Sequence, residues 1–271
     1  MNVALMRKRY PLTGYALITG ATSGIGFAFA CALAVRKVNI VLVARNEERL
    51  KKTQEYLIRS YGIECEILQA DVSRDDGLQC IQTRLTSAHN PISIFINNAG
   101  HGLHHKLATT DTEPLVHAMD VMAKAPVLLG AHAGNAMKER GNGIIINTAS
   151  ISGLVPMGLY SAIKSLVRTW SLSLGFELKN TGVRVITFMP GWVHTEHHKR
   201  AGITTSNIPS WLFITAQRAA NECLEKCEKG RWYVVPSHRF QVMEKLALHT
   251  PISIVGAITQ KIKKGRDAAQ H

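Results

Sequence analysis

Short apolar runs alternate with longer amphipathic stretches along nearly the whole chain. Run 39–44 is apolar at almost every position, which is typical of a parallel strand covered by helices on both faces. Run 64–69 instead alternates apolar and polar residues, as a half-buried strand does. The runs that predict strands are 15–19, 39–44, 64–69, 92–96, 143–147, 183–189 and 232–235.

Helical periodicity fills the segments between these runs. The helix that Asn46 is expected to cap carries one face at Leu50, Gln54, Leu57 and Tyr61. Strands joined by helices in this way form a parallel, doubly wound α/β sheet. We therefore expect about seven strands flanked by helices, in one domain spanning residues 1–271. The other predicted helices are 27–37, 75–88, 112–140, 159–179 and 215–229.

The composition is that of a globular protein with a basic surface. With 46% hydrophobic and 19% charged residues, the chain has ample material for a buried core. Its formal net charge of +13 fits either an anionic partner or a solvated basic surface. No predicted helix carries a dense basic stripe interleaved with aromatic residues, so we do not expect nucleic acid as the partner.

The cysteines and the start of the chain predict a reducing compartment. The five cysteines form no CxxC pair, and an odd number does not suit a complete set of disulfides. Residues 1–10 are basic and lack the apolar core of a secretory signal peptide. No apolar run reaches the roughly 18 residues that a membrane-spanning helix requires. We therefore expect a cytoplasmic protein.

Glycines crowd the end of the first predicted strand. Gly20, Gly24 and Gly26 come directly after strand 15–19 and before helix 27–37. Glycine lets the backbone approach a pyrophosphate closely, and the N-terminus of the next helix favours negative charge there. A tight strand–helix turn without a ligand is the alternative explanation.

Tyr160 and Lys164 stand four residues apart in a predicted helix and therefore share one face. A cation beside a phenol favours the ionised form and lowers the pKa of the phenol, which makes it a usable acid or base near neutral pH. Ser150 precedes the pair, shortly after strand 143–147. The three side chains form a candidate catalytic group.

Several ordered motifs together resemble those of one family. They are 19–26, 97–100, Ser150, Tyr160, Lys164 and 190–191. Taken together they are similar to the short-chain dehydrogenase/reductase family, and the likeness extends over about 16–236. The resemblance implies a Rossmann-type fold and an oxidoreductase that interconverts a carbonyl and an alcohol on a small molecule. Because a nicotinamide cofactor would supply the redox chemistry, we expect no metal.

The same resemblance implies roles for individual residues. Tyr160 would exchange a proton with the substrate oxygen, Lys164 would lower the pKa of Tyr160 and hold the nicotinamide ribose, and Ser150 would polarise the substrate oxygen. Further cofactor contacts are implied for Gly20, Ser23, Gly24, Ile25 and Gly26 in the glycine turn, Asp71 and Val72 at the adenine, Asn98, Ala99 and Gly100 beside the ribose, and Pro190, Gly191, Val193 and Thr195 at the nicotinamide half.

Arg45 favours NADP over NAD as the cofactor. It ends strand 39–44, where an acidic residue would hydrogen-bond the adenosine ribose of NAD. A guanidinium suits the 2′-phosphate of NADP instead, and no carboxylate sits at that strand end to repel the phosphate. A surface arginine at the start of a helix is the alternative.

Two departures from the family pattern lead to a second hypothesis. Met122 stands where relatives usually carry an asparagine, and a thioether has no donor or acceptor able to replace an amide in a water-mediated proton relay. The loop between Ser150 and Tyr160 is also shorter than in many relatives, so Ser152 is an alternative to Ser150. A catalytically weakened NADP-binding sensor or scaffold is the alternative function.

Histidines gather in two loops that border the expected substrate pocket. We expect them to assist the binding of an anionic substrate or to be solvated, rather than to bind a metal. The two groups are His101, His104 and His105, and His194, His197 and His198.

The C-terminal third predicts a lid and an extension. Segment 190–203, with 211–213, resembles the mobile substrate lid of the family. From about residue 238 the chain is basic and amphipathic, which fits packing on the sheet, an oligomer contact or weak contact with a membrane surface. Its loose likeness to relatives acting on acyl or steroid-like molecules indicates a hydrophobic substrate. The family resemblance implies a homodimer or homotetramer formed through 112–140 and 159–179.

Overall fold

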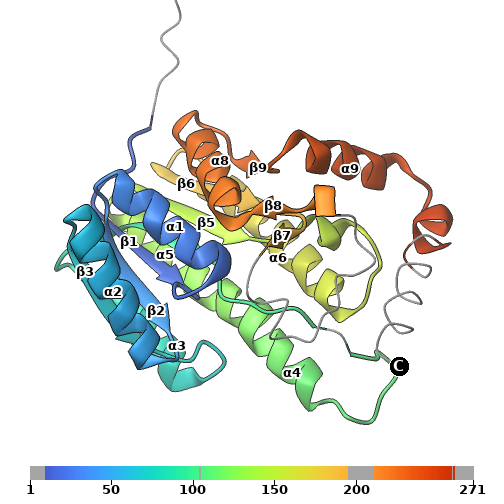
Figure 1. The fold of residues 1–271 in the computed structure, drawn as a ribbon, viewed down its shortest axis with the longest axis horizontal. Helices are drawn as coiled ribbons and strands as arrows, with labels where there is room; N and C mark the ends of the chain where they lie inside the picture. Colours follow the sequence, from blue (N-terminus) through green and yellow to red (C-terminus); the bar gives the residue numbers. More distant parts are fainter. Residues whose placement is uncertain (1–9, 104, 195–209, 258, 260–271) are drawn as a thin grey trace, which may run out of the picture.

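Seven parallel strands form one sheet at the centre of the computed structural model, which describes residues 10–103, 105–194, 210–257 and 259 (Figure 1). The strand order is β3-β2-β1-β4-β5-β6-β9, which confirms the predicted doubly wound sheet. The strands are β1 (Tyr15–Thr19), β2 (Asn39–Ala44), β3 (Cys65–Gln69), β4 (Ile92–Asn97), β5 (Gly143–Thr148), β6 (Val183–Phe188) and β9 (Tyr233–Val234).

Helices cover both faces of the sheet, as continuous apolar strands require. Successive residues of a strand point to opposite faces, so Ile18 joins the core beneath one helix layer and Leu17 joins the core beneath the other. One layer consists of α1 (Gly24–Val35), α2 (Glu47–Tyr61) and α8 (Ala216–Glu228). The other consists of α3 (Asp75–Thr86), α5 (Ala125–Glu139) and α6 (Leu159–Glu177).

A buried polar network fixes the carboxyl ends of the central strands. The amide of Asn97 donates to the Pro126 carbonyl at 2.8 Å and to Oδ1 of Asn147 at 3.2 Å. Asn147 in turn donates to Oγ of Ser171, which also accepts a hydrogen bond from Thr187. Because every member is paired inside the protein, the network locks β4, β5 and β6 to α5 and α6.

The long helix predicted over 112–140 is confirmed in its extent, but it is not a regular α-helix throughout. It consists of α4 (Glu113–Met119), a π-helical turn η1 (Asp120–Lys124) and α5. Pro126 lies in the first turn of α5 and has no N–H to donate to the preceding turn. A wider π turn accommodates this loss without ending the helix.

Two very short strands escaped the sequence analysis. β7 (Val193–His194) pairs with β8 (Ile214–Thr215) in a separate two-stranded sheet. Two residues are too few to show a periodicity, so the pattern gave no sign of them. Most of the predicted lid, with Thr195, His197 and His198, lies outside the described residues, as does His104.

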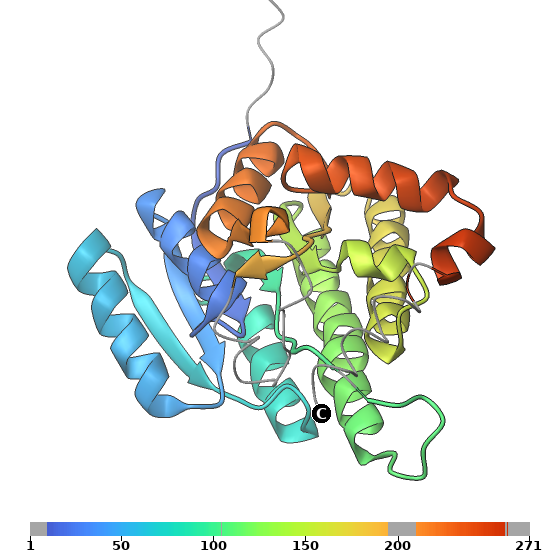
Figure 2. The same ribbon diagram turned by 45° about the vertical axis from the view of Figure 1, so that its right-hand side comes forward.

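The C-terminal extension begins with α9 (His238–His249), and Thr250 and Pro251 follow it. The helix lies at the periphery of the molecule, beyond the β9 end of the sheet (Figure 2). Lys261, Lys263, Lys264 and Arg266, which make the predicted tail basic, lie outside the described residues. In the part of the chain that is described, no helix combines the length and apolarity needed to cross a membrane.

Candidate active site

The glycine turn between β1 and α1 is shaped for close approach of a ligand. Gly20 and Gly24 have φ angles of +67° and +54°, a region that favours glycine. A Cβ on Gly26 would lie only 2.2 Å from the carbonyl oxygen of Gly20, so this position needs glycine as well. Ser23 precedes α1 without capping it through its side chain, and the first turn has no acidic residue. The N–H groups of this turn therefore face a site suited to an anion.

The segment after β4 is clamped to the end of β1. Oγ1 of Thr19 accepts hydrogen bonds from the backbone N–H groups of Asn98 and Ala99, at 2.9 and 3.0 Å. The amide of Asn98 donates to the Thr19 carbonyl at 3.0 Å. These hydrogen bonds bring the glycine turn and the segment after β4 together. The two approach so closely that a Cβ on Gly20 would lie 3.1 Å from Cα of Ala99.

The candidate catalytic side chains come from the end of β5 and the start of α6. Ser150 is buried, and its hydroxyl donates to the Pro190 carbonyl at 3.2 Å and accepts from the Ser152 N–H at 3.1 Å. Lys164 is also buried, and its Nζ donates to the Thr148 carbonyl at 2.8 Å.

Tyr160 lies between these two groups. Its ring centroid is 5.7 Å from Nζ of Lys164, and its hydroxyl hydrogen-bonds the Ser150 side chain. The structure thus pairs Tyr160 with Ser150, while Ser152 meets Ser150 through its backbone. The turn after Ser150 packs closely on α6, since a Cβ on Gly153 would lie only 2.7 Å from the backbone of Lys164.

The expected lowering of the Tyr160 pKa is not the net effect in this structure. Burial raises the pKa of Tyr160, and the hydrogen bond with Ser150 lowers it only in part. Burial likewise lowers the pKa of Lys164 to about 8, because a low-dielectric surrounding disfavours the charged form. The four-residue spacing reveals the attraction between phenol and cation, whereas the desolvation of both groups is defined only in the folded chain.

A cavity of about 290 Å³ lies at the carboxyl ends of β1, β4, β5 and β6. Most of the predicted site residues line it, namely Gly20, Ser23, Gly24, Ile25, Asn98, Gly100, Ser150, Tyr160, Lys164, Pro190, Gly191 and Val193. Gly26, Arg45, Asp71, Val72 and Ala99 are not part of its wall, and Thr195 lies outside the described residues.

Apolar side chains on the cavity wall were missed by the sequence analysis. Leu103, Ile151, Met157 and Trp192 line the cavity beside the candidate catalytic group. All four lie in loops or short turns, where no periodicity marks a buried face. Trp192 was within reach of the sequence argument, because it stands between the predicted cofactor contacts Gly191 and Val193.

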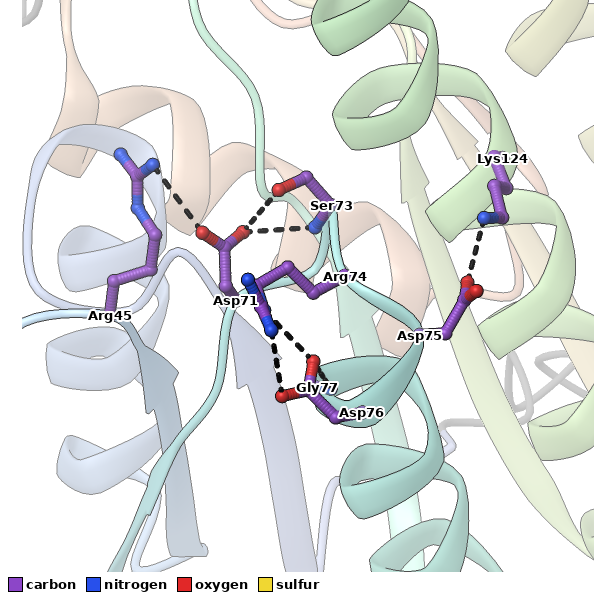
Figure 3. A network of polar contacts seen from close by, with 8 residues as sticks. All are labelled: Arg45, Asp71, Ser73, Arg74, Asp75, Asp76, Gly77 and Lys124. Atoms are coloured by element: carbon purple, nitrogen blue, oxygen red, sulfur yellow. Dashed lines mark hydrogen bonds and ion pairs between the residues drawn. The ribbon is translucent and has the colours of Figure 1, made fainter.

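The exposed Arg45 and the half-buried Asp71 form an ion pair at the ends of β2 and β3 (Figure 3). The guanidinium of Arg45 is 3.8 Å from the carboxylate of Asp71. The expectation that no carboxylate lies at this strand end was therefore wrong, because the neighbouring strand supplies one. Partial burial raises the pKa of Asp71, but hydrogen bonds from Ser73 and the charges of Arg45 and His117 outweigh it and lower the pKa.

Met122 occupies a fully buried position in the π turn. Its Sδ accepts a hydrogen bond from the backbone N–H of His101, with a donor–acceptor distance of 3.4 Å. The thioether thus serves as a weak acceptor for a backbone group, which does not make it a substitute for the amide of a proton relay. It has no proton to donate, so Met122 itself cannot pass a proton onward.

Two buried polar atoms on the cavity wall have no hydrogen-bond partner among the described residues. They are Oγ1 of Thr148 and Nε2 of His101, whose ring stacks on His117 at a centroid distance of 5.6 Å. Unpaired buried polar atoms are rare, and a ligand in the cavity would supply partners. Together with the open glycine turn, they fit a polar cofactor. Among the described residues, no three histidine, cysteine or acidic side chains gather as metal ligands would.

Residues 14–205 match the family model described as short chain dehydrogenase. The chain belongs to the short-chain dehydrogenase/reductase family. It is 31% identical over 196 residues to the very-long-chain 3-oxoacyl-CoA reductase of Anas platyrhynchos, an alignment that covers 69% of this chain and 62% of the relative. It is also 33% identical over 183 residues to an uncharacterized oxidoreductase of Thermotoga maritima, covering 66% of this chain and 72% of that protein.

Solved structures of similar proteins share this fold. The short-chain dehydrogenase from Sphingobium yanoikuyae in complex with NADPH matches with a TM-score of 0.79 and 29% identity, covering 87% of this chain and 94% of that one. The bulky-bulky ketone specific alcohol dehydrogenase from Comamonas testosteroni matches with a TM-score of 0.75 and 26% identity, covering 89% and 96%.

Proposed function

We propose that this short-chain dehydrogenase/reductase is an NADP-dependent oxidoreductase that interconverts a carbonyl and an alcohol on a hydrophobic small molecule. The observation that carries the proposal is the convergence of Ser150, Tyr160 and Lys164 on one cavity that also includes the glycine turn after β1. Three separate parts of the sequence meet there, each with the chemistry that the reaction needs.

In this proposal Tyr160 gives a proton to the substrate oxygen, or takes one from it. Its hydroxyl is hydrogen-bonded to Ser150, so both groups can reach the same substrate oxygen. Lys164 is held by the Thr148 carbonyl next to the Tyr160 ring. Its positive charge stabilises the phenolate that forms once Tyr160 has given up its proton.

The residues present fit a nicotinamide dinucleotide. The turn of Gly20, Gly24 and Gly26 would hold the pyrophosphate, and Lys164 and the unpaired Oγ1 of Thr148 would face the nicotinamide ribose. When bound, this cofactor donates or accepts the hydride. Arg45 supports NADP, since its exposed guanidinium at the end of β2 suits a 2′-phosphate. The relative from Sphingobium yanoikuyae was solved in complex with NADPH.

The wall of the cavity supports a hydrophobic substrate. Leu103, Ile151, Met157 and Trp192 offer apolar surface beside the candidate proton donor. The names of two relatives are in keeping with this, since one is a very-long-chain 3-oxoacyl-CoA reductase and the other is specific for bulky-bulky ketones.

We also propose a cytoplasmic homodimer or homotetramer that pairs through α4, α5 and α6. Val116, Met119, Leu128 and Leu166 on these helices are exposed apolar residues, which an isologous helix contact would cover. Light scattering coupled to size-exclusion chromatography measures the mass directly. A monomer at micromolar concentration contradicts this part of the proposal.

The test of the main proposal is a cofactor titration followed by a substrate panel. Purified full-length protein is titrated with NADPH and NADH by fluorescence, and NADPH oxidation is then followed with ketones, aldehydes and 3-oxoacyl thioesters. We expect tighter binding of NADPH and turnover of at least one apolar carbonyl compound. Absence of NADPH binding refutes the proposal, whereas NADPH binding without turnover of any compound favours the sensor or scaffold.

A further inference from the structure

Apolar and basic side chains are exposed on α9 and on the residues that follow it. Val242, Leu246 and Leu248 on α9, and Ile252 and Ile254 after it, are each more than half exposed. A soluble surface rarely shows so many large apolar side chains within one short stretch of chain.

The charges on this stretch are of one sign. Arg239 and Lys245 are exposed on α9. The acidic residue of the helix, Glu244, is half-buried and accepts a hydrogen bond from the Tyr233 hydroxyl. The outer side of α9 therefore presents apolar and cationic groups without an exposed carboxylate.

Trp211 extends this surface from a different part of the chain. It is exposed, the guanidinium of Arg239 lies 5.6 Å from its ring centroid, and Nη1 of Arg239 donates a hydrogen bond to its carbonyl oxygen. Tryptophan is enriched where proteins meet the interfacial region of a bilayer. We call the set Trp211, Arg239, Val242, Lys245, Leu246, Ile252 and Ile254 the α9 surface.

The inner side of α9 is firmly anchored. Phe240 is fully buried, and its ring packs so closely on Gly191 that a Cβ there would lie 2.5 Å from it. The Phe240 ring also lies 6.5 Å from that of Trp192. Before the helix, the N–H of Ser237 donates to the carboxylate of Glu222 at 2.7 Å. The apolar outer side is thus held outward on a fixed helix instead of being a loose segment that could fold back.

We propose that the α9 surface binds the surface of an anionic lipid bilayer. A helix with apolar and cationic residues on its outer side lies in the interface between headgroups and acyl chains, and anionic lipids strengthen its binding. Charge complementarity selects this occupant over a second copy of the chain. Two copies would bring like charges together, on a protein of formal net charge +13.

Binding in this way brings the cavity close to the bilayer. Phe240 of α9 packs on Gly191 and Trp192, and both of these residues line the cavity. An apolar substrate dissolved in the bilayer would then have a short path to the site. The lipid contact itself does not depend on any redox activity, so its test is independent of the proposed reaction.

The test is cosedimentation of the full-length protein with phosphatidylcholine vesicles, with and without phosphatidylserine, at low and high salt. We expect binding only when phosphatidylserine is present, and weaker binding at high salt. Lys245→Glu should lower the partition coefficient about tenfold, since each basic residue near the surface contributes substantially. Leu246→Ser should lower it about fivefold through lost apolar burial.

Matched controls are Lys138→Glu on α5 and Ile58→Ser on α2, which change exposed residues of the same kind elsewhere. Neither should reduce binding. The proposal is overturned if wild-type protein does not sediment with phosphatidylserine vesicles at low salt, or if all four variants bind equally well. Self-association that Leu246→Ser abolishes, without vesicle binding, would instead assign the surface to a second copy.

Discussion

The proposed cofactor site has two cationic side chains, of which Lys164 is buried and Arg45 is exposed. Lys164 is buried, donates to a backbone carbonyl at 2.8 Å, and has its pKa lowered to about 8. The Arg45 side chain is 68% exposed, and its ion pair with Asp71 spans 3.8 Å. Burying the charge of Lys164 lowers the stability of the folded protein, whereas the exposed charge of Arg45 has almost no effect on stability.

The two ends of the proposed cofactor site should therefore have different roles: Lys164 positions the reacting groups, and Arg45 affects how tightly the cofactor binds. The end of the site with Lys164 is built on β5 and α6, whose ends are locked by the network around Asn97 and Asn147. The end with Arg45 lies on exposed strand–helix connections. Substitutions at the buried end should therefore change the rate or the stability, and those at the exposed end should change only which cofactor binds and how tightly.

Removal of the Tyr160 hydroxyl should have the largest effect. We expect Tyr160→Phe to lower kcat about a thousandfold, in the range that general acid–base catalysis contributes, because the proton donor is lost. NADPH affinity should stay within about twofold, since the phenyl ring remains. Steady-state kinetics and fluorescence titration measure the two quantities, and Tyr56→Phe on α2 is the matched control. Unchanged turnover in Tyr160→Phe would remove Tyr160 from the mechanism.

The buried cation should leave a signature in the pH dependence of stability. The folded pKa of Lys164 is about 8 and its ordinary value is 10.5, so between these pH values the unfolded chain holds more protons. The contribution of Lys164 to stability therefore becomes more favourable as pH rises through this window, by about 3 kcal/mol. Lys164→Met abolishes it.

The measurement is urea unfolding of the ligand-free protein and of Lys164→Met at pH 7, 8, 9 and 10. Buried cysteines such as Cys65 and Cys227 have raised pKa values and oppose the trend above pH 9, but they do so equally in both proteins. The stability difference between the two proteins isolates Lys164. Lys138→Met, at an exposed position, should show no such slope. A difference that does not change with pH would mean that Lys164 is not buried as described.

Arg45 tests the exposed end. We expect Arg45→Gln to weaken NADPH binding about tenfold, the loss of one charge-assisted contact, with NADH binding and kcat unchanged. Arg59→Gln, at the other end of α2, is the control. Equal weakening of NADH would show that Arg45 contacts a part that the two cofactors share.

The sequence predicted the sheet better than the surroundings of the site. The strand β2 is apolar at every position after Asn39, and its bounds were predicted to the residue because burial on both faces leaves a continuous apolar run. The turns after β1, β4 and β5 were placed correctly because parallel topology puts all of their carboxyl ends at one edge.

What the sequence could not supply were effects that depend on neighbours in space. The carboxylate facing Arg45 comes from the adjacent strand, so no inspection of the residues around position 45 reveals it. The net pKa shift of Tyr160 depends on burial, which only the folded chain defines. The π turn around Met122 lies directly before Pro126, whose missing N–H is visible in the sequence but falls within a helical periodicity.

The smallest effect should come from the carboxylate beside Arg45. Asp71→Asn keeps a side chain that can accept hydrogen bonds from Ser73 but removes a negative charge close to the proposed 2′-phosphate. Because Arg45 is exposed and solvent screens its charge, the gain is limited, and we expect the ratio of NADPH to NADH affinity to rise about threefold. Asp76→Asn, whose carboxylate pairs with Arg74, should leave this ratio unchanged. If Asp71 also holds the adenine, Asp71→Asn should weaken the binding of NADPH and NADH equally. Only the ratio of the two affinities therefore reports on the charge. A ratio that stays constant would contradict the placement of the 2′-phosphate near Arg45.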